Sequence, residues 1–216
     1  MIAGVSVEVG SEAVVVRSHA PLRVLSSAVH LGGFTDARAI VNLHVEKHDP
    51  CEDPAGMIGA FAHRAGVGAP WVGLLTGAHT ERAVQVEEAA GGFHALAVVT
   101  VGLSNPVAAG SSPVANWVAS TINTIVVVDA DPEPAALVNA VITATEVKGL
   151  ALRDAGLLAD GRAASGTSTD AVVIAATGRG PVARFGGPAS EMGWVVARAV
   201  RLALDRAIGD WQERHR

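Results

Sequence analysis

The sequence contains one short segment in which a glycine, three hydroxyl side chains and a carboxylate follow one another directly. It is GTSTD, residues 166–170, and an uninterrupted apolar run from Ala171 to Ala176 follows it. Glycine allows a sharp turn or a close approach to a ligand, and successive N–H groups in such a turn can bind an anion. The hydroxyls can donate, accept or act as nucleophiles, and Asp170 can act as a base. Taken alone, the pattern is more typical of a hydroxyl-rich turn capped by Asp170 than of a catalytic site.

A lysine lies in the apolar stripe of the helix that we predict just before this segment, over residues 133–155. At 100° per residue, Lys148 falls in the middle of that stripe, and Glu146 falls on the opposite, polar side. The ammonium group of a lysine on a packed face needs water or a partner. Two interpretations therefore stay open. Lys148 is either a snorkelling or ion-paired structural residue, or a residue that lines a site, where it binds an anionic group or acts as a base.

Small polar side chains recur at the ends of three other predicted strands. They are Ser26 and Ser27, Ser104 and Asn105, and Thr121 and Asn123. With the GTSTD segment, this makes four strand ends of the same kind in one chain. We therefore expect an uncharged cleft rich in hydrogen-bonding groups, which suits a bulky neutral ligand with many amides better than a phosphate.

The elements that position these residues follow from hydrophobic periodicity and from turn and capping residues. Alternating or β-branched segments predict strands at 5–9, 13–17, 22–28, 39–45, 71–78, 83–88, 93–103, 121–129 and 171–177. Helices are expected at 54–66, capped by Asp53 with Pro54 at its first position, at 133–155, and from about Pro188 to the C-terminal region. Hairpins dominate the first half and helices cluster late. This order predicts a single α+β domain over residues 1–216, with a mixed, mostly antiparallel sheet of about eight strands packed against about three helices.

The composition excludes several classes of protein. Half of the residues are hydrophobic and 17% are charged, with a net charge of −5, so we expect a sizeable core and no nucleic-acid partner. The single cysteine, Cys51, favours a reducing compartment, and we predict a cytoplasmic protein. Residues 89–128 carry no Asp, Glu, Lys or Arg, but polar residues, Gly and Pro break their apolar runs, so no membrane segment or membrane partner is expected. Apolar helix faces would permit a homodimer.

No motif for a metal or a cofactor is present in the sequence. The eight histidines are dispersed, and His44 and His48, although four residues apart, fall where a strand runs into a loop. Nucleophile-elbow, Walker and dinucleotide-binding patterns are also missing. We therefore predict no metal site and no cofactor.

Seven segments occur in an order that resembles the adenosylcobinamide amidohydrolase family. They are LSSA with a following GG, GLLTGA, TVGLSNPVAAG, TINTIVVVD, TEVKGLALRDAGL, SGTSTDAVVIAATG and FGGPASEMGWVVARAV. The resemblance as a whole runs from about residue 22 to 203. The resemblance implies an enzyme of cobalamin salvage. It would hydrolyse the amide between the aminopropanol arm and the corrin ring of adenosylcobinamide and release adenosylcobyric acid, with the corrinoid as substrate and no other cofactor.

The positions that match the family's polar residues are the candidate site. The catalytic candidates are Glu146, Lys148 and Asp170, and the candidates for substrate binding are Ser26, Ser27, Asn105, Thr121, Asn123, Thr167, Ser168, Thr169 and Glu191. In the arrangement that we expect, the N–H groups of 166–169, with Asn105 or Asn123, surround the oxyanion. Glu146 or Asp170 is the base, which acts on water or on a Thr or Ser hydroxyl. Lys148 fixes that carboxylate or protonates the leaving amine. Two alternatives stay open: a corrinoid-binding domain without hydrolysis, and a phosphate-handling enzyme that uses the GTST loop.

Overall fold

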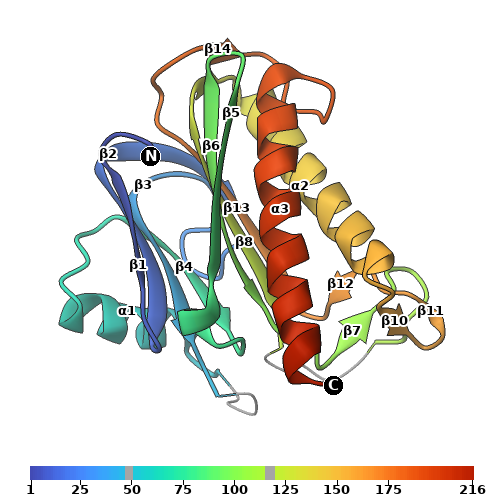
Figure 1. The fold of residues 1–216 in the computed structure, drawn as a ribbon. Helices are drawn as coiled ribbons and strands as arrows, with labels where there is room; N and C mark the ends of the chain where they lie inside the picture. Colours follow the sequence, from blue (N-terminus) through green and yellow to red (C-terminus); the bar gives the residue numbers. More distant parts are fainter. Residues whose placement is uncertain (47–50, 115–119) are drawn as a thin grey trace.

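The computed structural model describes residues 1–46, 51–114 and 120–216, and its centre is one bent sheet of eight strands (Figure 1). The strands are β1 (Val5–Val9), β2 (Ala13–Ser26), β3 (Gly33–His44), β4 (Trp71–Thr76), β5 (Val84–Ala90), β6 (Phe93–Val101), β8 (Ile122–Asp129) and β13 (Ala171–Ala176). Their order is β4-β3-β2-β13-β8-β6-β5, with β1 paired to β2. Only β3–β4 and β8–β13 are parallel among these pairs. The predicted α+β class and its mostly antiparallel sheet are confirmed.

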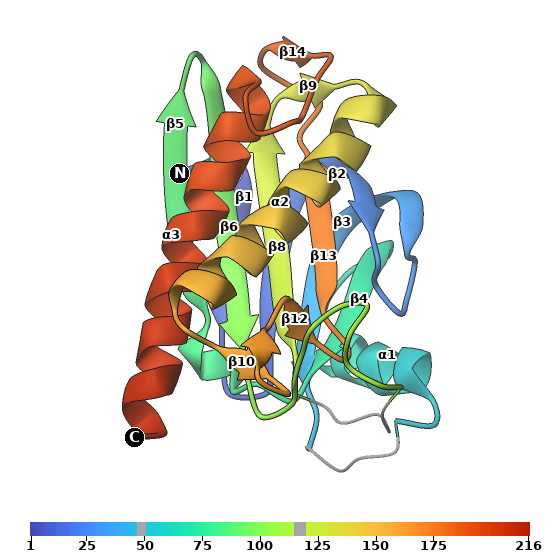
Figure 2. The same cartoon turned by 90° about the vertical axis from the view of Figure 1, so that its right-hand side faces the viewer.

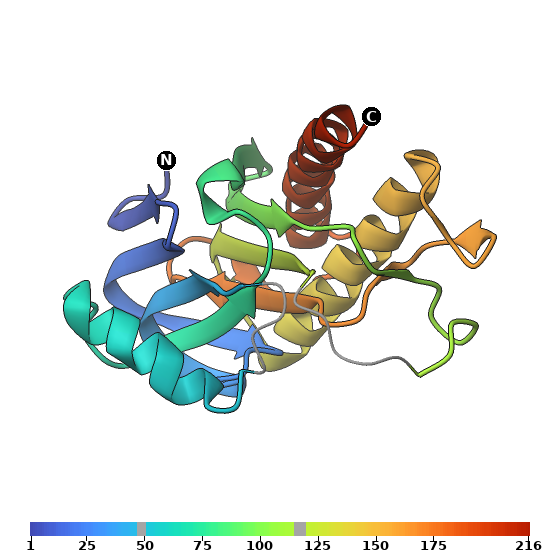
Figure 3. The same ribbon diagram turned by 90° about the horizontal axis from the view of Figure 1, so that it is seen from below.

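Three helices cover the outer sides of this sheet, as expected. They are α1 (Pro54–Arg64), α2 (Pro134–Asp154) and α3 (Glu191–Arg214). Helices α2 and α3 lie across β6, β8 and β13 (Figure 2), whereas α1 packs on β3 and β4 at the other side of the molecule (Figure 3). Between the two halves of the bent sheet lies a separate apolar cluster, to which β2, β3 and β4 contribute from one half and β6, β8 and β13 from the other. From one side of the molecule to the other, the layers are therefore helix, sheet, sheet and helix.

Short elements complete the chain. They are the 3-10 turn η1 (Thr80–Arg82) and the two-residue strands β7 (Pro106–Val107), β9 (Asp131–Pro132), β10 (Leu158–Ala159), β11 (Arg162–Ala163), β12 (Gly166–Thr167) and β14 (Val182–Ala183). The pair β7–β12 matters most for the site, because it ties the loop after β6 to the segment that precedes β13.

The structure corrects three predicted boundaries. The strand expected at 39–45 already begins at Gly33, where it pairs with the end of β2. The two strands expected at 13–17 and 22–28 are one long strand, β2, which passes through an irregular register between Arg17 and Leu22 instead of ending there. The last helix begins at Glu191 and not near Pro188, because the Ser190 side chain accepts the Gly193 N–H at 3.1 Å and so caps the helix. The Asp53 cap and Pro54 at the start of α1 are confirmed.

Helix α2 is, among the described helices, the one with the length and apolar composition that a membrane span needs. Half of that stretch is buried inside the fold, where α2 packs on α3 and β13. A core helix of a globular protein meets the same criteria, so we interpret α2 as such a helix.

A close backbone contact at the start of α3 gives a prediction about stability. A Cβ on Gly193 would collide with the carbonyl oxygens of Gly186 and Gly187, which the backbone cannot easily move away. We expect Gly193→Ala to lower the free energy of unfolding by about 3 kcal/mol. The matched control is Gly209→Ala in the same helix, where nothing lies within 4 Å of the added carbon, and which should stabilise the protein by up to about 1 kcal/mol. Chemical denaturation of both variants measures the difference, and equal effects would contradict this account.

Candidate active site

A buried ion pair joins the two residues that the sequence singled out most clearly. Lys148 Nζ, from α2, donates to Asp170 Oδ2, which lies directly before β13. The two side chains are only 10% and 8% exposed. Lys148 is therefore ion-paired, as one of its two interpretations expected. Its partner Asp170 also lines a pocket, so the ion pair lies at the edge of that pocket.

Asp170 accepts three further hydrogen bonds. The Thr167 N–H donates to Oδ2 at 3.0 Å, the Ile122 N–H donates to Oδ1 at 2.9 Å, and the Thr167 hydroxyl also donates to Oδ1. With Lys148, these donors occupy the roughly four lone-pair positions of a carboxylate. These four donors fix the orientation of the carboxylate.

Gly166 is required for this arrangement. A Cβ at this position would collide with Asp170 Oδ2 and would lie 2.9 Å from Lys148 Nζ. Gly166 and Thr167 also form β12, so the backbone of the GTSTD segment is held on β7. The Thr167 N–H, which we expected to surround an oxyanion, is already donated to Asp170. The loop therefore binds the carboxylate of its own chain in place of a free anion.

A pair of hydroxyls lies beside this carboxylate. Thr121 Oγ1 and Thr169 Oγ1 form a hydrogen bond in which either can donate, and Thr121 is fully buried. The parallel pairing of β8 and β13 brings them together, because Asn123 lies opposite Ala171 and the residues before the two strands are therefore neighbours. Ser168, next to this pair, accepts from Asn105 Nδ2 at 2.6 Å.

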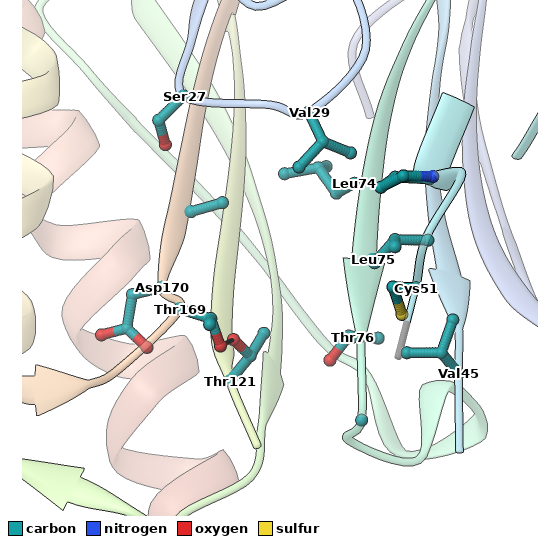
Figure 4. A pocket seen from close by; sticks show the side chains of 13 residues that line it. Ser27, Val29, Val45, Cys51, Leu74, Leu75, Thr76, Thr121, Thr169 and Asp170 are labelled. Carbon is teal, nitrogen blue, oxygen red and sulfur yellow. Dashed lines mark hydrogen bonds between the residues drawn. The ribbon is translucent and has the colours of Figure 1, made fainter. Parts of the chain in front are cut away.

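These hydroxyls open into a cavity of about 330 Å³ between the two halves of the sheet, which we call the reaction pocket (Figure 4). Its lining residues are Ser27, Val29, Val45, Cys51, Pro54, Leu74, Leu75, Thr76, Gly77, Thr121, Thr169, Asp170 and Ala171. The hydroxyls of Thr121 and Thr169 lie on the β8 and β13 side, and apolar side chains of β4 form the opposite wall (Figure 4). The Asp170 carboxylate lies beside the hydroxyls but points away from that wall, toward the helices (Figure 4). A mostly apolar cavity with a few convergent polar groups is typical of a small-molecule site.

The structure places the remaining predicted residues at varying distances from this pocket. Ser27 lines it, and its hydroxyl accepts the Val172 N–H at 3.0 Å. Ser26 is buried and accepts from the Ala28 N–H. Asn123 lies deeper, where its Nδ2 donates to Asn42 Oδ1 at 2.8 Å and to the Leu75 carbonyl at 2.9 Å.

Two predicted acids do not join the cluster. Glu146 is exposed on α2, while Lys148 of the same helix is buried. Glu191 is exposed at the start of α3, beside Gly91 in the turn between β5 and β6, at the end of the sheet away from the reaction pocket (Figure 1). Both residues were predicted as site residues because they match polar positions of the family. The fold does not bring either side chain to Asp170.

Sequence reasoning missed the wall opposite the hydroxyls. Leu74, Leu75 and Thr76 come from β4, whose apolar sequence is equally typical of a core strand. The sequence did contain one signal for the buried polar residues around Asn123. Asn42 is a polar residue within the apolar run of β3, and it is 1% exposed and donates to Thr100 Oγ1 at 3.0 Å.

In the described part of the chain, no three His, Cys, Asp or Glu side chains come together as ligands for a metal ion. His48, one member of the sequence pair noted above, lies outside the described residues. The expectation of no metal site therefore stays a prediction.

The fold and the site together define an α+β protein with a hydroxyl-bearing, largely apolar pocket, backed by a buried lysine–aspartate pair. The family model CbiZ, adenosylcobinamide amidohydrolase, matches residues 2–216. The adenosylcobinamide amidohydrolase of Methanosarcina mazei is 32% identical over 178 residues, which cover 78% of this chain and 82% of that protein. The chain therefore belongs to the adenosylcobinamide amidohydrolase family, and the predicted resemblance is confirmed. It is an enzyme that hydrolyses an amide bond of a corrinoid.

A solved structure supports the fold alone. The crystal structure of the PH0078 protein from Pyrococcus horikoshii OT3 superimposes with a TM-score of 0.51 at 13% sequence identity, and the match covers 96% of this chain and 80% of that chain.

Proposed function

We propose that this protein hydrolyses the amide bond that links the aminopropanol arm to the corrin ring of adenosylcobinamide, and that it thereby forms adenosylcobyric acid for cobamide salvage. One observation carries the proposal. In a chain of this family, two hydroxyls lie at one side of a largely apolar pocket, and the carboxylate of Asp170 lies directly beside them. These groups are of the kind that amide hydrolysis needs, because the attacking oxygen must lose a proton and the carbonyl must be polarised.

The size of the reaction pocket supports an arm as the reacting part of the substrate. A corrin ring with its side chains is much larger than a cavity of about 330 Å³. The ring must therefore stay at the mouth while one side chain enters. The wall formed by Val29, Leu74 and Leu75 suits the methylene groups of the propionate and the methyl group of aminopropanol.

The reaction that follows from this placement uses one water molecule. The scissile carbonyl lies against the Thr121–Thr169 hydroxyl pair, which donates to its oxygen as negative charge develops. A water molecule bonds to the carbonyl carbon and gives a proton to Asp170. The C–N bond then breaks, and the same proton passes to the leaving nitrogen of aminopropanol.

Asp170 must release one of its four donors to act in this way. Two of them are backbone N–H groups, which the chain fixes, and the third is the ammonium group of Lys148. The hydroxyl of Thr167 is the fourth, and it can rotate away without any movement of the backbone. In this proposal Lys148 holds the Asp170 carboxylate in place while it accepts the proton.

The contacts of the GTSTD segment argue against the phosphate-handling alternative. Lys148 and the Thr167 N–H would be the natural phosphate ligands, and both already bind Asp170. A phosphate at this position would have to lie against a carboxylate of the same sign, which is unfavourable.

The hydroxyl of Thr169 gives a testable prediction. Thr169→Val keeps the shape of the side chain but removes the donor, so we expect kcat to fall by about 10²–10³-fold, as when an oxyanion donor is removed. Thr169→Ser keeps the hydroxyl and should stay within about tenfold of the wild-type enzyme. Steady-state release of aminopropanol measures both variants. Equal activity of the Val and Ser variants would exclude Thr169 from the chemistry.

Incubation with adenosylcobinamide, followed by mass spectrometry of the corrinoid and of the released amine, tests the proposed function. We expect adenosylcobyric acid together with aminopropanol. A corrinoid of unchanged mass that nevertheless stays bound to the protein would contradict hydrolysis and favour the binding-domain alternative.

A further inference from the structure

A second cavity of about 300 Å³ lies next to the reaction pocket, and Gly77 lines both. We call it the histidine pocket, because His44, His79 and His215, three of the eight histidines of the chain, line it. Nothing in the proposed reaction uses these residues.

The two pockets lie on opposite sides of one thin wall made of strand ends. Val45, Thr76 and Thr121 line the reaction pocket, whereas His44, Ala78 and Ser120 line the histidine pocket. Adjacent residues in an extended chain point to opposite sides, which explains the alternation at His44–Val45 and Ser120–Thr121. A ligand too large for either cavity can therefore lie across the wall and reach into both.

The imidazole rings of this pocket are arranged so that one nitrogen of each is held by a partner. His44 Nδ1 lies 2.9 Å from the Ala78 carbonyl oxygen, which can only accept, so Nδ1 donates this hydrogen bond. His79 Nδ1 lies 3.4 Å from Glu81 Oε1, and the His79 ring stacks on His44 with centroids 5.7 Å apart. A carboxylate beside one ring nitrogen is the usual support for a histidine that binds a metal through the other nitrogen.

We propose that His79 binds the cobalt of the corrinoid substrate through Nε2, at the lower axial position, while the aminopropanol arm enters the reaction pocket. His79 is the suitable ligand because its side chain is 60% exposed and can approach a flat ring, whereas His44 is half-buried behind it. The inference rests on the proposed function, since it requires a corrinoid substrate.

Coordination chemistry agrees with a single protein ligand. The corrin ring itself supplies four equatorial nitrogens, so no cluster of three protein ligands is needed, and in the described part of the chain none is found. Cobinamide has no nucleotide base, so water occupies its lower axial position. The Co–O bond to that water breaks, the Co–Nε2 bond forms, and the oxidation state of cobalt does not change.

The geometry of the substrate links the two pockets. The aminopropanol arm descends from the lower face of the corrin ring, which is the face that His79 would approach. A ring lying over the wall with its lower face toward the protein would place the arm and the cobalt above neighbouring pockets. Binding of cobalt by His79 would thus orient the ring and deliver one particular arm to Asp170.

Absorption and electron paramagnetic resonance spectra of the bound substrate test this inference. With adenosylcobinamide, the wild-type protein should move the visible absorption band to longer wavelength, as an axial imidazole does. His79→Ala should lose this shift, and the matched control His63→Ala, which changes an exposed histidine of α1, should keep it.

The electron paramagnetic resonance spectrum of bound Co(II)-cobinamide gives a second readout. Each cobalt hyperfine line should split into three through one 14N nucleus of the protein, and into two when the histidines carry 15N. Glu81→Gln should weaken binding of Co(II)-cobinamide about tenfold, as the loss of an outer partner of a metal ligand does.

Aminopropanol release, measured in the same samples, separates this inference from the proposed function. Wild-type protein that releases aminopropanol while the bound corrinoid keeps the spectrum of the free one would overturn the role of His79 and leave the proposed function standing. A spectral shift that persists in His79→Ala and disappears in His44→Ala would also overturn the assignment. A shift without aminopropanol release would instead overturn the proposed function.

Discussion

Asp170→Asn is expected to lower kcat for aminopropanol release by about 10²–10⁴-fold, the range over which a general base contributes to catalysis. The amide of asparagine keeps the size of the side chain and can still accept the Ile122 N–H, but it cannot take a proton from water. Because the substrate contacts other parts of the pocket, KM should change much less than kcat. Initial rates over a range of adenosylcobinamide concentrations measure the two constants separately.

The control for this variant is Asp36→Asn, which changes the same side chain at an exposed position of β3 and should stay within about threefold of wild type. Thermal unfolding of both variants shows whether the folded protein was assayed. An Asp170→Asn enzyme that is folded and retains more than a tenth of the wild-type kcat would remove Asp170 from the role of base.

The second large effect concerns stability. Lys148→Met should lower the free energy of unfolding by about 3 kcal/mol, because breaking a buried ion pair leaves the other charge without its partner. The figure lies at the lower end of the usual range, since Asp170 keeps three other hydrogen-bond donors. The double variant Lys148→Met, Asp170→Asn removes both charges, so neither is left buried without a partner. The free energies of unfolding lost in the two single variants should therefore sum to more than the loss in the double variant.

Glu146→Ala is the matched control on the same helix. Glu146 is exposed, so its removal should change the free energy of unfolding by less than about 0.5 kcal/mol. Urea denaturation of the wild type and the four variants measures all of these differences. Similar losses for Lys148→Met and Glu146→Ala would show that the buried pair contributes nothing to the fold.

The sequence predicted the parts of this site that depend on local structure. The apolar stripe of α2 correctly showed that Lys148 is buried, and the GTSTD segment correctly preceded a buried strand. The choice between Glu146 and Asp170 as the partner of Lys148 could not be made in this way. Asp170 is 22 residues away, and only the packing of α2 on β13 brings the two together.

Other parts of the site depend on how the sheet bends, which no local pattern encodes. β4 and β8 are far apart in the order of strands, but the bend places them on opposite sides of the reaction pocket. An apolar strand in a core and one in a pocket wall have the same sequence pattern, so Leu74 and Leu75 gave no signal. Glu146 and Glu191 show the converse: both match the family pattern, and the fold leaves both exposed and away from Asp170.

The most direct test of the central claim follows the oxygen of water into the corrinoid. We expect adenosylcobinamide treated with the protein in H₂¹⁸O to give adenosylcobyric acid that carries one ¹⁸O atom in the new carboxylate, together with an equal amount of unlabelled aminopropanol. Release of ammonia in place of aminopropanol would show that a different amide of the corrinoid is hydrolysed. A corrinoid recovered without label would contradict hydrolysis altogether.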